Sequence, residues 1–288
     1  MKSYLFILVF ALVVSNMHAI AQGDLLITPK RVVFDGNKQR EELSLVNIGK
    51  DTATYSISFV HKNMQEDGSF ITVEKPDSGQ HFAEPYLRIF PRQITLAPGE
   101  PQSIMLQYRR TADMVTGEYR SHLWFRSEKD YHPLGTKELS KDSSQVSVQL
   151  IPIFGISIAI IIKSGTVSVT TSLSDLKLET REDTLQILHF TIHRAGNCSS
   201  YGNVIVEYIP EQGKTIQIGL VKSLGVYSNL DQRKVSVKLN PVPGLTLKSG
   251  KLRVRYTSPD EAKYTIYAEK EISSDELQRV NYAITSIK

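Results

Sequence analysis

The feature that most constrains this chain is a long apolar run near its middle, QVSVQLIPIFGISIAIIIKSG, at residues 145–165. Isoleucine fills seven of the twelve positions from Ile151 to Ile162. A transmembrane helix needs about 20 apolar residues, whereas Pro152, Gly155 and polar residues interrupt this run. Apolar residues recur at every second position, and β-branched side chains fit a pleated strand better than a helix. The run is therefore predicted to form one strand, or two strands broken near the proline and the glycine.

The first 21 residues have the organisation of a secretory signal peptide. A lysine is followed by an apolar core from Tyr4 to Val14 and then by Ala19-Ile20-Ala21, the small-x-small pattern of a signal peptidase site. An apolar core of eleven residues is too short to cross a bilayer as a retained anchor. We expect residues 1–21 to be removed and the rest of the chain to be exported.

Length and charge narrow the class of protein. The full sequence has 288 residues, which is too long for one ordinary sandwich and suits two domains. Its formal net charge of +4 is too small to indicate binding to nucleic acid or to an anionic membrane. The single cysteine, Cys198, cannot form an internal disulfide and is expected to be a small apolar core residue.

Short alternating segments separated by turn residues fill the rest of the chain. The first predicted strands lie near Arg31–Phe34, Glu42–Asn47 and Thr54–Val60. Six or seven such strands within about 140 residues indicate a β-sandwich. A similar pattern begins again after the apolar run and predicts a second all-β unit. The expected fold class is all-β, with domains at residues 22–162 and 163–288.

No catalytic motif stands out. The sequence has no G-x-S-x-G elbow, P-loop, G-x-G-x-x-G or H-E-x-x-H pattern. His189 and His193 would lie about 13 Å apart on a strand, too far to share one metal ion. The only tryptophan, Trp124, is expected in the core of its strand rather than on a ligand surface. We therefore expect no enzymatic activity, no cofactor and no metal.

Several segments, taken in order, resemble the periplasmic chaperones of the chaperone-usher pathway of pilus assembly. The family's first two strands are similar to KRVVFDGNKQREELSLVN. A later family segment with the pattern L-x-P-G-x-x-Q is similar to FPRQITLAPGEPQSIMLQYRR, and the strand that follows it is similar to GEYRSHLWF. The resemblance covers Thr28 to about Ile162, is looser beyond, and suggests a divergent branch. It implies two immunoglobulin-like β-sandwich domains in a boomerang arrangement and a periplasmic location.

The resemblance also implies that the protein lends a strand to its client. Members of the family hold pilus or fimbrial subunits that lack their last strand, and they fill the open groove with alternating apolar side chains of their own seventh strand. In this sequence the matching residues are Val146, Val148 and Leu150 of QVSVQL. An exposed apolar edge strand would otherwise promote aggregation. The implied partners are these subunits and an outer-membrane usher, with no nucleic acid and no small-molecule cofactor.

The family anchors the client's C-terminal carboxylate in the interdomain cleft with an arginine of the first strand and a lysine of the seventh. Arg31 matches the arginine, and a guanidinium fork suits a carboxylate. Lys30 is expected to point to the opposite strand face. The position of the lysine falls near Gly155, where no Lys or Arg lies within seven residues on either side. Either Arg31 acts with backbone or hydroxyl donors such as Ser157, or the client is held differently.

The alternative is a structural or adhesive surface protein made of two immunoglobulin-like domains, because a fold does not fix a function. Such a protein would have the same sandwiches but no client. A neighbouring gene for an usher-like outer-membrane barrel, together with genes for small subunits with an alternating N-terminal extension, would favour the chaperone.

Overall fold

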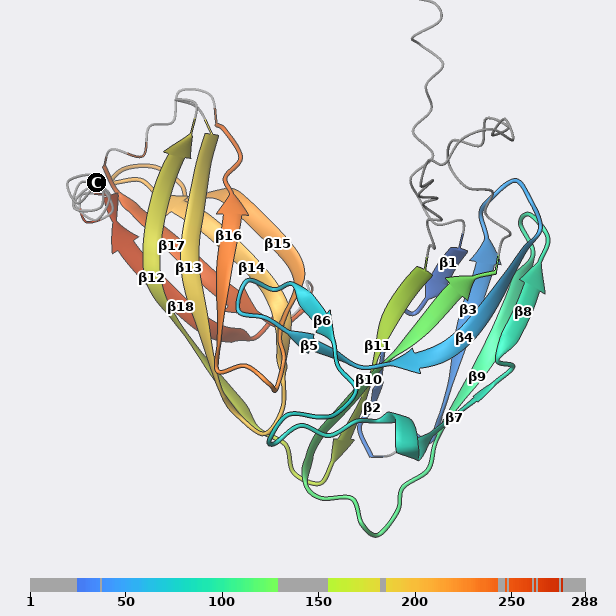
Figure 1. Cartoon of the computed structure of the whole chain (residues 1–288). Coiled ribbons are helices and arrows are strands. Elements are labelled where there is room, and N and C mark those ends of the chain that lie inside the picture. Colours follow the sequence, from blue (N-terminus) through green and yellow to red (C-terminus); the bar gives the residue numbers. More distant parts are fainter. Residues whose placement is uncertain are drawn as a thin grey trace, which may run out of the picture.

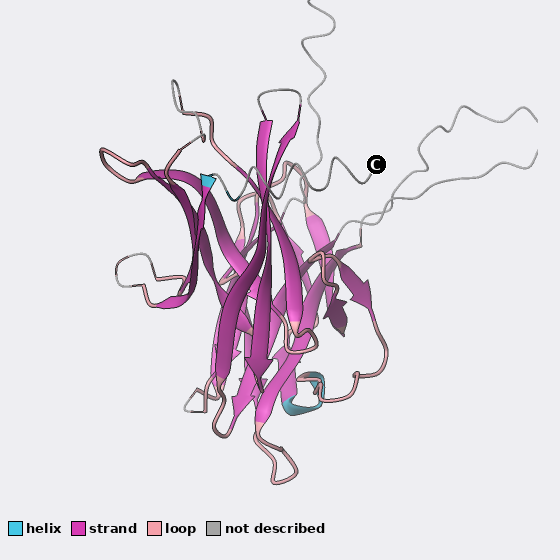
Figure 2. Ribbon diagram, turned by 90° about the vertical axis from the view of Figure 1, so that its left-hand side faces the viewer, coloured by secondary structure: helices cyan, strands magenta, loops and turns pink. Residues whose placement is uncertain are grey.

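The computed structural model describes residues 25–36, 38–128, 155–181, 185–242, 247, 249–260, 262, 264–274 and 276. Strands are almost the only regular structure there; the exceptions are a short 3-10 helix at Glu84–Tyr86 and helical residues at Ser274 and Glu276 (Figure 2). No helix of this part of the chain is long and apolar enough to cross a membrane. The expected signal peptide and the three expected donor residues, Val146, Val148 and Leu150, lie outside the described residues.

The first domain is a sandwich of two sheets. One sheet has the order β1 (Leu25–Thr28), β3 (Arg40–Asn47), β9 (Pro101–Tyr108), β7 (Leu87–Phe90). The other has the order β2 (Arg31–Phe34), β11 (Gly155–Ser164), β10 (Gly117–Ser127), β4 (Ala53–Val60), β8 (Gln93–Leu96). A separate hairpin of β5 (Lys62–Met64) and β6 (Phe70–Thr72) leaves this domain and reaches toward the second one (Figure 1).

Alternation along the strands builds the core of the first domain. On β11 the side chains of Ile158, Ile160 and Ile162 are buried in this core, so the strand predicted in the isoleucine run is confirmed from Gly155 onward. A side chain at Gly155 would collide with the indole of Trp124. Glycine at this position therefore leaves room for the Trp124 ring to lie against β11.

The second domain is a sandwich with its own core. Its sheets have the orders β12 (Val169–Arg181), β13 (Leu185–Gly196), β16 (Gln232–Lys238) and β15 (Ile216–Val226), β14 (Ser200–Ile209), β17 (Lys251–Thr257), β18 (Ile266–Ser273). Leu188, Val206 and Val254 are fully buried between the sheets. Cys198 is buried, as predicted.

The two sandwiches form the arms of a V that meet near β10 and β11 (Figure 1). The prediction of an all-β chain with two immunoglobulin-like sandwich domains in a boomerang arrangement is confirmed. Ile162 is the last described residue of the first core and Leu173 the first of the second. The boundary at residues 162 and 163 stays a prediction.

The prediction that Trp124 lies in the core is wrong. Leu123 and Phe125, its neighbours on β10, are buried in the first core, whereas Trp124 is half-buried on the opposite face. Successive side chains of a strand point to opposite faces, so only one of the two faces can join the core. The tryptophan lies on the outer face of its sheet.

Truncating Ile160 to alanine should destabilise the first domain by about 2–5 kcal/mol, because Ile160 is fully buried and the change leaves a cavity. Trp124 is the only tryptophan and belongs to this domain, so its fluorescence in a urea titration reports the unfolding. Ile48→Ala is the matched control, since Ile48 is 58% exposed. Equal midpoints for the two variants would contradict the assignment of the core.

Candidate functional site

One face of the five-stranded sheet lies against the space between the domains. The register places Ala159 of β11 between Arg31 of β2 and His122 of β10. Side chains directly opposite each other in a sheet share a face, so these three residues form one row. The buried Ile160 points to the other face, into the core. One face of β11 therefore packs in the core of the first domain, and its other face forms a wall of the cleft.

A cavity of about 410 Å³ lies at this junction. Its lining comes from both domains, because Arg31 and Ser157 belong to the first sandwich while Tyr201 belongs to the second. Among the described residues that line it there is no aspartate or glutamate. The basic residues of the lining are Lys30, Arg31, Lys62, Arg120, Lys222 and Arg233.

Arg31, the arginine singled out from the sequence, lies in this cavity. Its guanidinium carbon is 4.2 Å from the centroid of the Tyr201 ring, a cation-π contact that joins the two domains. Burial, and then the charge of Arg120, lowers the pKa of Arg31. An arginine nevertheless stays charged at neutral pH. In the described part of the chain no acceptor bonds to its guanidinium, so its N–H groups are available to a ligand.

Lys62 was missed in the sequence, and the structure places it beside β11. Its Nζ donates a hydrogen bond to Ser157 Oγ at 2.8 Å. Ser157 precedes Ala159 by two residues, so it points to the same face as the row that contains Arg31. Burial lowers the pKa of Lys62. A lysine supplied by β5 therefore lies next to the beginning of β11, the part of the strand around Gly155 where the sequence has no lysine.

No local pattern could have identified Lys62, because 95 positions of sequence separate it from Ser157. The prediction that Lys30 points to the strand face opposite Arg31 is also wrong. Lys30 lines the same cavity as Arg31 instead of pointing away from it. It lies in a bend before β2, where the two-residue alternation of a strand does not apply.

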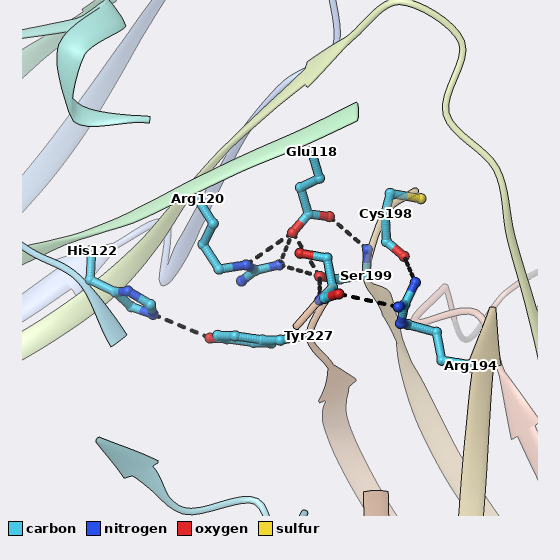
Figure 3. A network of polar contacts seen from close by, with 8 residues as sticks. Glu118, Arg120, His122, Arg194, Cys198, Ser199 and Tyr227 are labelled. Carbon is cyan, nitrogen blue, oxygen red and sulfur yellow. Dashed lines mark hydrogen bonds and ion pairs between the residues drawn. The ribbon is translucent and has the colours of Figure 1, made fainter. Parts of the chain in front are cut away.

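A buried ion pair lies behind the cavity at the junction of the domains (Figure 3). Arg120 donates to Glu118 Oε1 from Nε at 3.0 Å and from Nη2 at 2.7 Å. Ser199 of the second domain satisfies the same carboxylate, through its backbone N–H at 2.8 Å and its hydroxyl at 2.7 Å. The guanidinium of Arg120 also lies 3.7 Å from the centroid of the Tyr227 ring. The pair is therefore complete only when both domains are in place.

The environment sets the protonation of this network. Burial alone would raise the pKa of Glu118, but the charge of Arg120 and the hydrogen bonds from Ser199 outweigh it, so the pKa lies below its ordinary value of 4.5. Burial, followed by the charge of Arg120, lowers the pKa of His122 to about 3. His122 is therefore neutral at neutral pH, with Nε2 3.2 Å from the Tyr227 hydroxyl.

Arg194 holds the segment that carries Ser199. This buried arginine donates to four backbone carbonyls, those of Gly196 at 2.7 Å, Cys198 at 3.1 Å, Ser228 at 3.2 Å and Leu230 at 2.7 Å. Figure 3 shows the bond to Cys198. Charge-assisted hydrogen bonds of this kind are stronger than neutral ones. The backbone N–H of Ser199 is thereby kept in place for Glu118.

The β5–β6 hairpin forms a second bridge between the domains. Glu66 at its turn accepts a backbone hydrogen bond from Lys234 at 2.7 Å and a side-chain hydrogen bond from Gln232 at 2.8 Å. Asn229 donates to the carbonyl of Met64 at 2.8 Å. These contacts fix the strand that carries Lys62, so the lysine is positioned by the second domain as well as by the first.

No model of a protein family matches the sequence, and no curated protein matches it. Solved structures are similar at low identity. A chain of the CsuC-CsuE chaperone-tip adhesion subunit pre-assembly complex from archaic chaperone-usher Csu pili of Acinetobacter baumannii is 14% identical, with 87% of this chain and 98% of that chain covered and a TM-score of 0.42.

Two further solved structures have similar values. The Pseudomonas aeruginosa CupB2 chaperone is 9% identical, with 86% of this chain and 99% of that chain covered and a TM-score of 0.40. A chain of the Salmonella enterica SafA pilin complex with the SafB chaperone is 12% identical, with 86% and 98% covered and a TM-score of 0.38. At these scores the function has to be argued from the residues of this chain.

Replacing Glu118 by glutamine should destabilise the protein by about 3–5 kcal/mol at pH 7, because Arg120 then keeps a buried charge without its counter-ion. The lowered pKa of Glu118 means that its contribution is present above pH 4.5 and is lost as the pH falls through the folded-state value. Urea unfolding should therefore show that the difference in unfolding free energy between the variant and the unaltered protein is smaller at pH 3 than at pH 7.

The control for this experiment is Glu42→Gln, since Glu42 is an exposed carboxylate on β3. It should change the unfolding free energy little at either pH. A cost for Glu118→Gln that is the same at pH 7 and pH 3 would contradict the ion-pair account.

Proposed function

We propose that this protein is a periplasmic, non-enzymatic chaperone that binds incomplete pilus or fimbrial subunits and completes them with a strand of its own for assembly at the cell surface. The observation that carries the proposal is the basic cleft beside β11. Arg31 and Lys62 lie along the face of the strand that follows the apolar QVSVQL segment. A binding site for a chain end and a strand able to pair with the same chain are thus adjacent.

The pairing of β11 supports the lending of a strand. β10 pairs with it along its whole length, from Gly155 to Ser164. β2 pairs with it only from Ala159 to Ile162. Among the described strands, the first four residues of β11 therefore have a partner on one side only, and an open edge of this kind accepts an added strand.

The donor residues are part of the proposal. Val146, Val148 and Leu150 precede β11, and they have the same even-numbered spacing as the core residue Ile158. In a strand continued backward from β11 they would lie on one face. We propose that this face fills the groove of the client, where main-chain hydrogen bonds give affinity and the alternate side chains occupy pockets.

Arg31 and Lys62 would bind the client's C-terminal carboxylate. Arginine offers a fork of two N–H groups, and an ammonium adds a compact charge. Both side chains are partly desolvated, which strengthens their interaction with an anion. The sequence left open whether Arg31 acts with backbone or hydroxyl donors such as Ser157 or whether the client is held differently. Lys62, which donates to Ser157, is a partner that neither possibility named.

The alternative, a structural or adhesive surface protein, accounts for the two sandwiches but gives no role to the basic cleft. The predicted signal peptide supports export of the protein. The second proposed partner is an outer-membrane usher, to which the chaperone would deliver its clients.

Changing both Val148 and Leu150 to serine should strongly reduce the amount of client recovered, since the apolar side chains that fill the groove are lost. The measurement is co-expression with the subunit encoded next to the chaperone gene, followed by affinity purification of an expected one-to-one complex. The control is Ser147→Ala with Gln149→Ala, which would lie on the opposite face if the segment continues the strand as proposed. Equal recovery from both double variants would eliminate the donor-strand proposal.

Arg31→Ala and Lys62→Met should each lower the yield of stable client and of assembled pili, because each removes a charge from the proposed carboxylate site. Arg40→Ala, an exposed arginine of β3, serves as the control and should leave the yield unchanged. Quantitative blotting of the subunit in the periplasm provides the measurement. An unchanged yield in both cleft variants would reduce Arg31 and Lys62 to structural residues.

A further inference from the structure

We infer that the cleft prefers a client chain end that carries an acidic side chain in addition to its terminal carboxylate, and that Arg233 of the second domain contacts this second charge. The inference rests on the proposed function, because it takes the chain end as the occupant of the cavity. It goes further by naming the chemistry of that end and by giving the second domain a part in recognition.

The first argument is the balance of charge. Of the basic residues in the lining, Arg120 has its counter-ion in Glu118. Arg31 and Arg233 have no carboxylate in ion-pair contact within the described chain, and Lys62 has only a hydroxyl partner. Burying a charge without an anion is costly. A single terminal carboxylate can offset one of these three charges, so a ligand with a second negative charge is favoured.

The second argument is the state of Arg233 itself. It lies on β16 and lines the cavity. One guanidinium nitrogen donates to the carbonyl of Gly225, while its buried Nε has no hydrogen-bond partner in the part of the chain that the structure describes. Burial lowers the pKa of Arg233, although nearby tyrosines and Asp67 favour its charged form. Asp67 is on the exposed turn of the β5–β6 hairpin and does not line the cavity.

The third argument is the placement of the two arginines. Arg31 comes from β2 of the first domain and Arg233 from β16 of the second, and both line the cavity. A volume of about 410 Å³ is within the range of roughly 300–1,000 Å³ that bound ligands occupy. Two charges contributed separately by the two domains fit two carboxylates on one chain end better than a single carboxylate. The terminal carboxylate would meet Arg31 and Lys62, and the acidic side chain would meet Arg233.

Fluorescence anisotropy with labelled synthetic peptides tests this inference on the purified full chain. Three peptides share a stretch of alternating valine and threonine and end in a free aspartate, a free asparagine or an asparagine amide. The aspartate peptide should bind about tenfold more tightly than the free asparagine peptide, as expected for one added charge-assisted hydrogen bond.

Variants then assign the preference. Arg233→Gln should abolish the ratio of aspartate to asparagine affinity, and Arg233→Lys should retain part of it because the charge remains. Lys238→Gln, an exposed position on the same strand, should keep the full ratio. The ratio compares two peptides on one variant, so a partial loss of folded protein does not change it.

The outcomes are distinct. Equal affinity of the aspartate and asparagine peptides, an unchanged ratio in Arg233→Gln, or no binding of any peptide would overturn the inference. Equal affinity of the free asparagine peptide and its amide would instead count against the carboxylate site of the proposed function. A preference for the aspartate peptide that is lost when Arg233 is changed to glutamine, and is kept in Lys238→Gln, supports the inference.

Discussion

The structure depends on the buried ion pair between Glu118 and Arg120. Such a pair is stable only when hydrogen bonds satisfy the groups that the interior removes from water. Here Ser199 supplies two of those bonds from the other domain, and Arg194 holds the backbone around Ser199. Satisfying the pair therefore also fixes the two sandwiches relative to each other, and the angle between them creates the cleft.

The same arrangement determines what the cleft can bind. Glu118 is committed to Arg120, so it does not offset the charge of the neighbouring Arg31 through an ion pair. The hairpin that docks on the second domain brings Lys62 to β11. Among the described strands, the beginning of β11 has a partner on one side only. This short strand therefore contributes to a core, to a basic wall of the cleft and to a surface for strand addition. The basic wall requires the domains to stay in their observed arrangement, because the second domain holds the hairpin that carries Lys62.

Local pattern predicted much of the fold and little of the site. Alternation and β-branching identified the strand at Arg31–Phe34 and the isoleucine strand, because a half-buried strand leaves a period of two in the sequence. The face of Trp124 was predicted wrongly, since period alone does not say which side is the core. Lys62 and the partners of Glu118 could not be predicted, because pairing between distant segments places them and no local pattern records it.

Cross-linking from inside the cleft tests the central claim, that a client's chain end lies there, most directly. A photo-reactive phenylalanine derivative at Val221, which lines the cavity on β15, would be activated in the co-expressed chaperone and subunit complex. Mass spectrometry of the product should identify the C-terminal peptide of the subunit, and the same group at the exposed Val115 should give no such product. A cross-link from Val221 to an internal segment of the subunit, or none in a complex that still forms, would contradict the account.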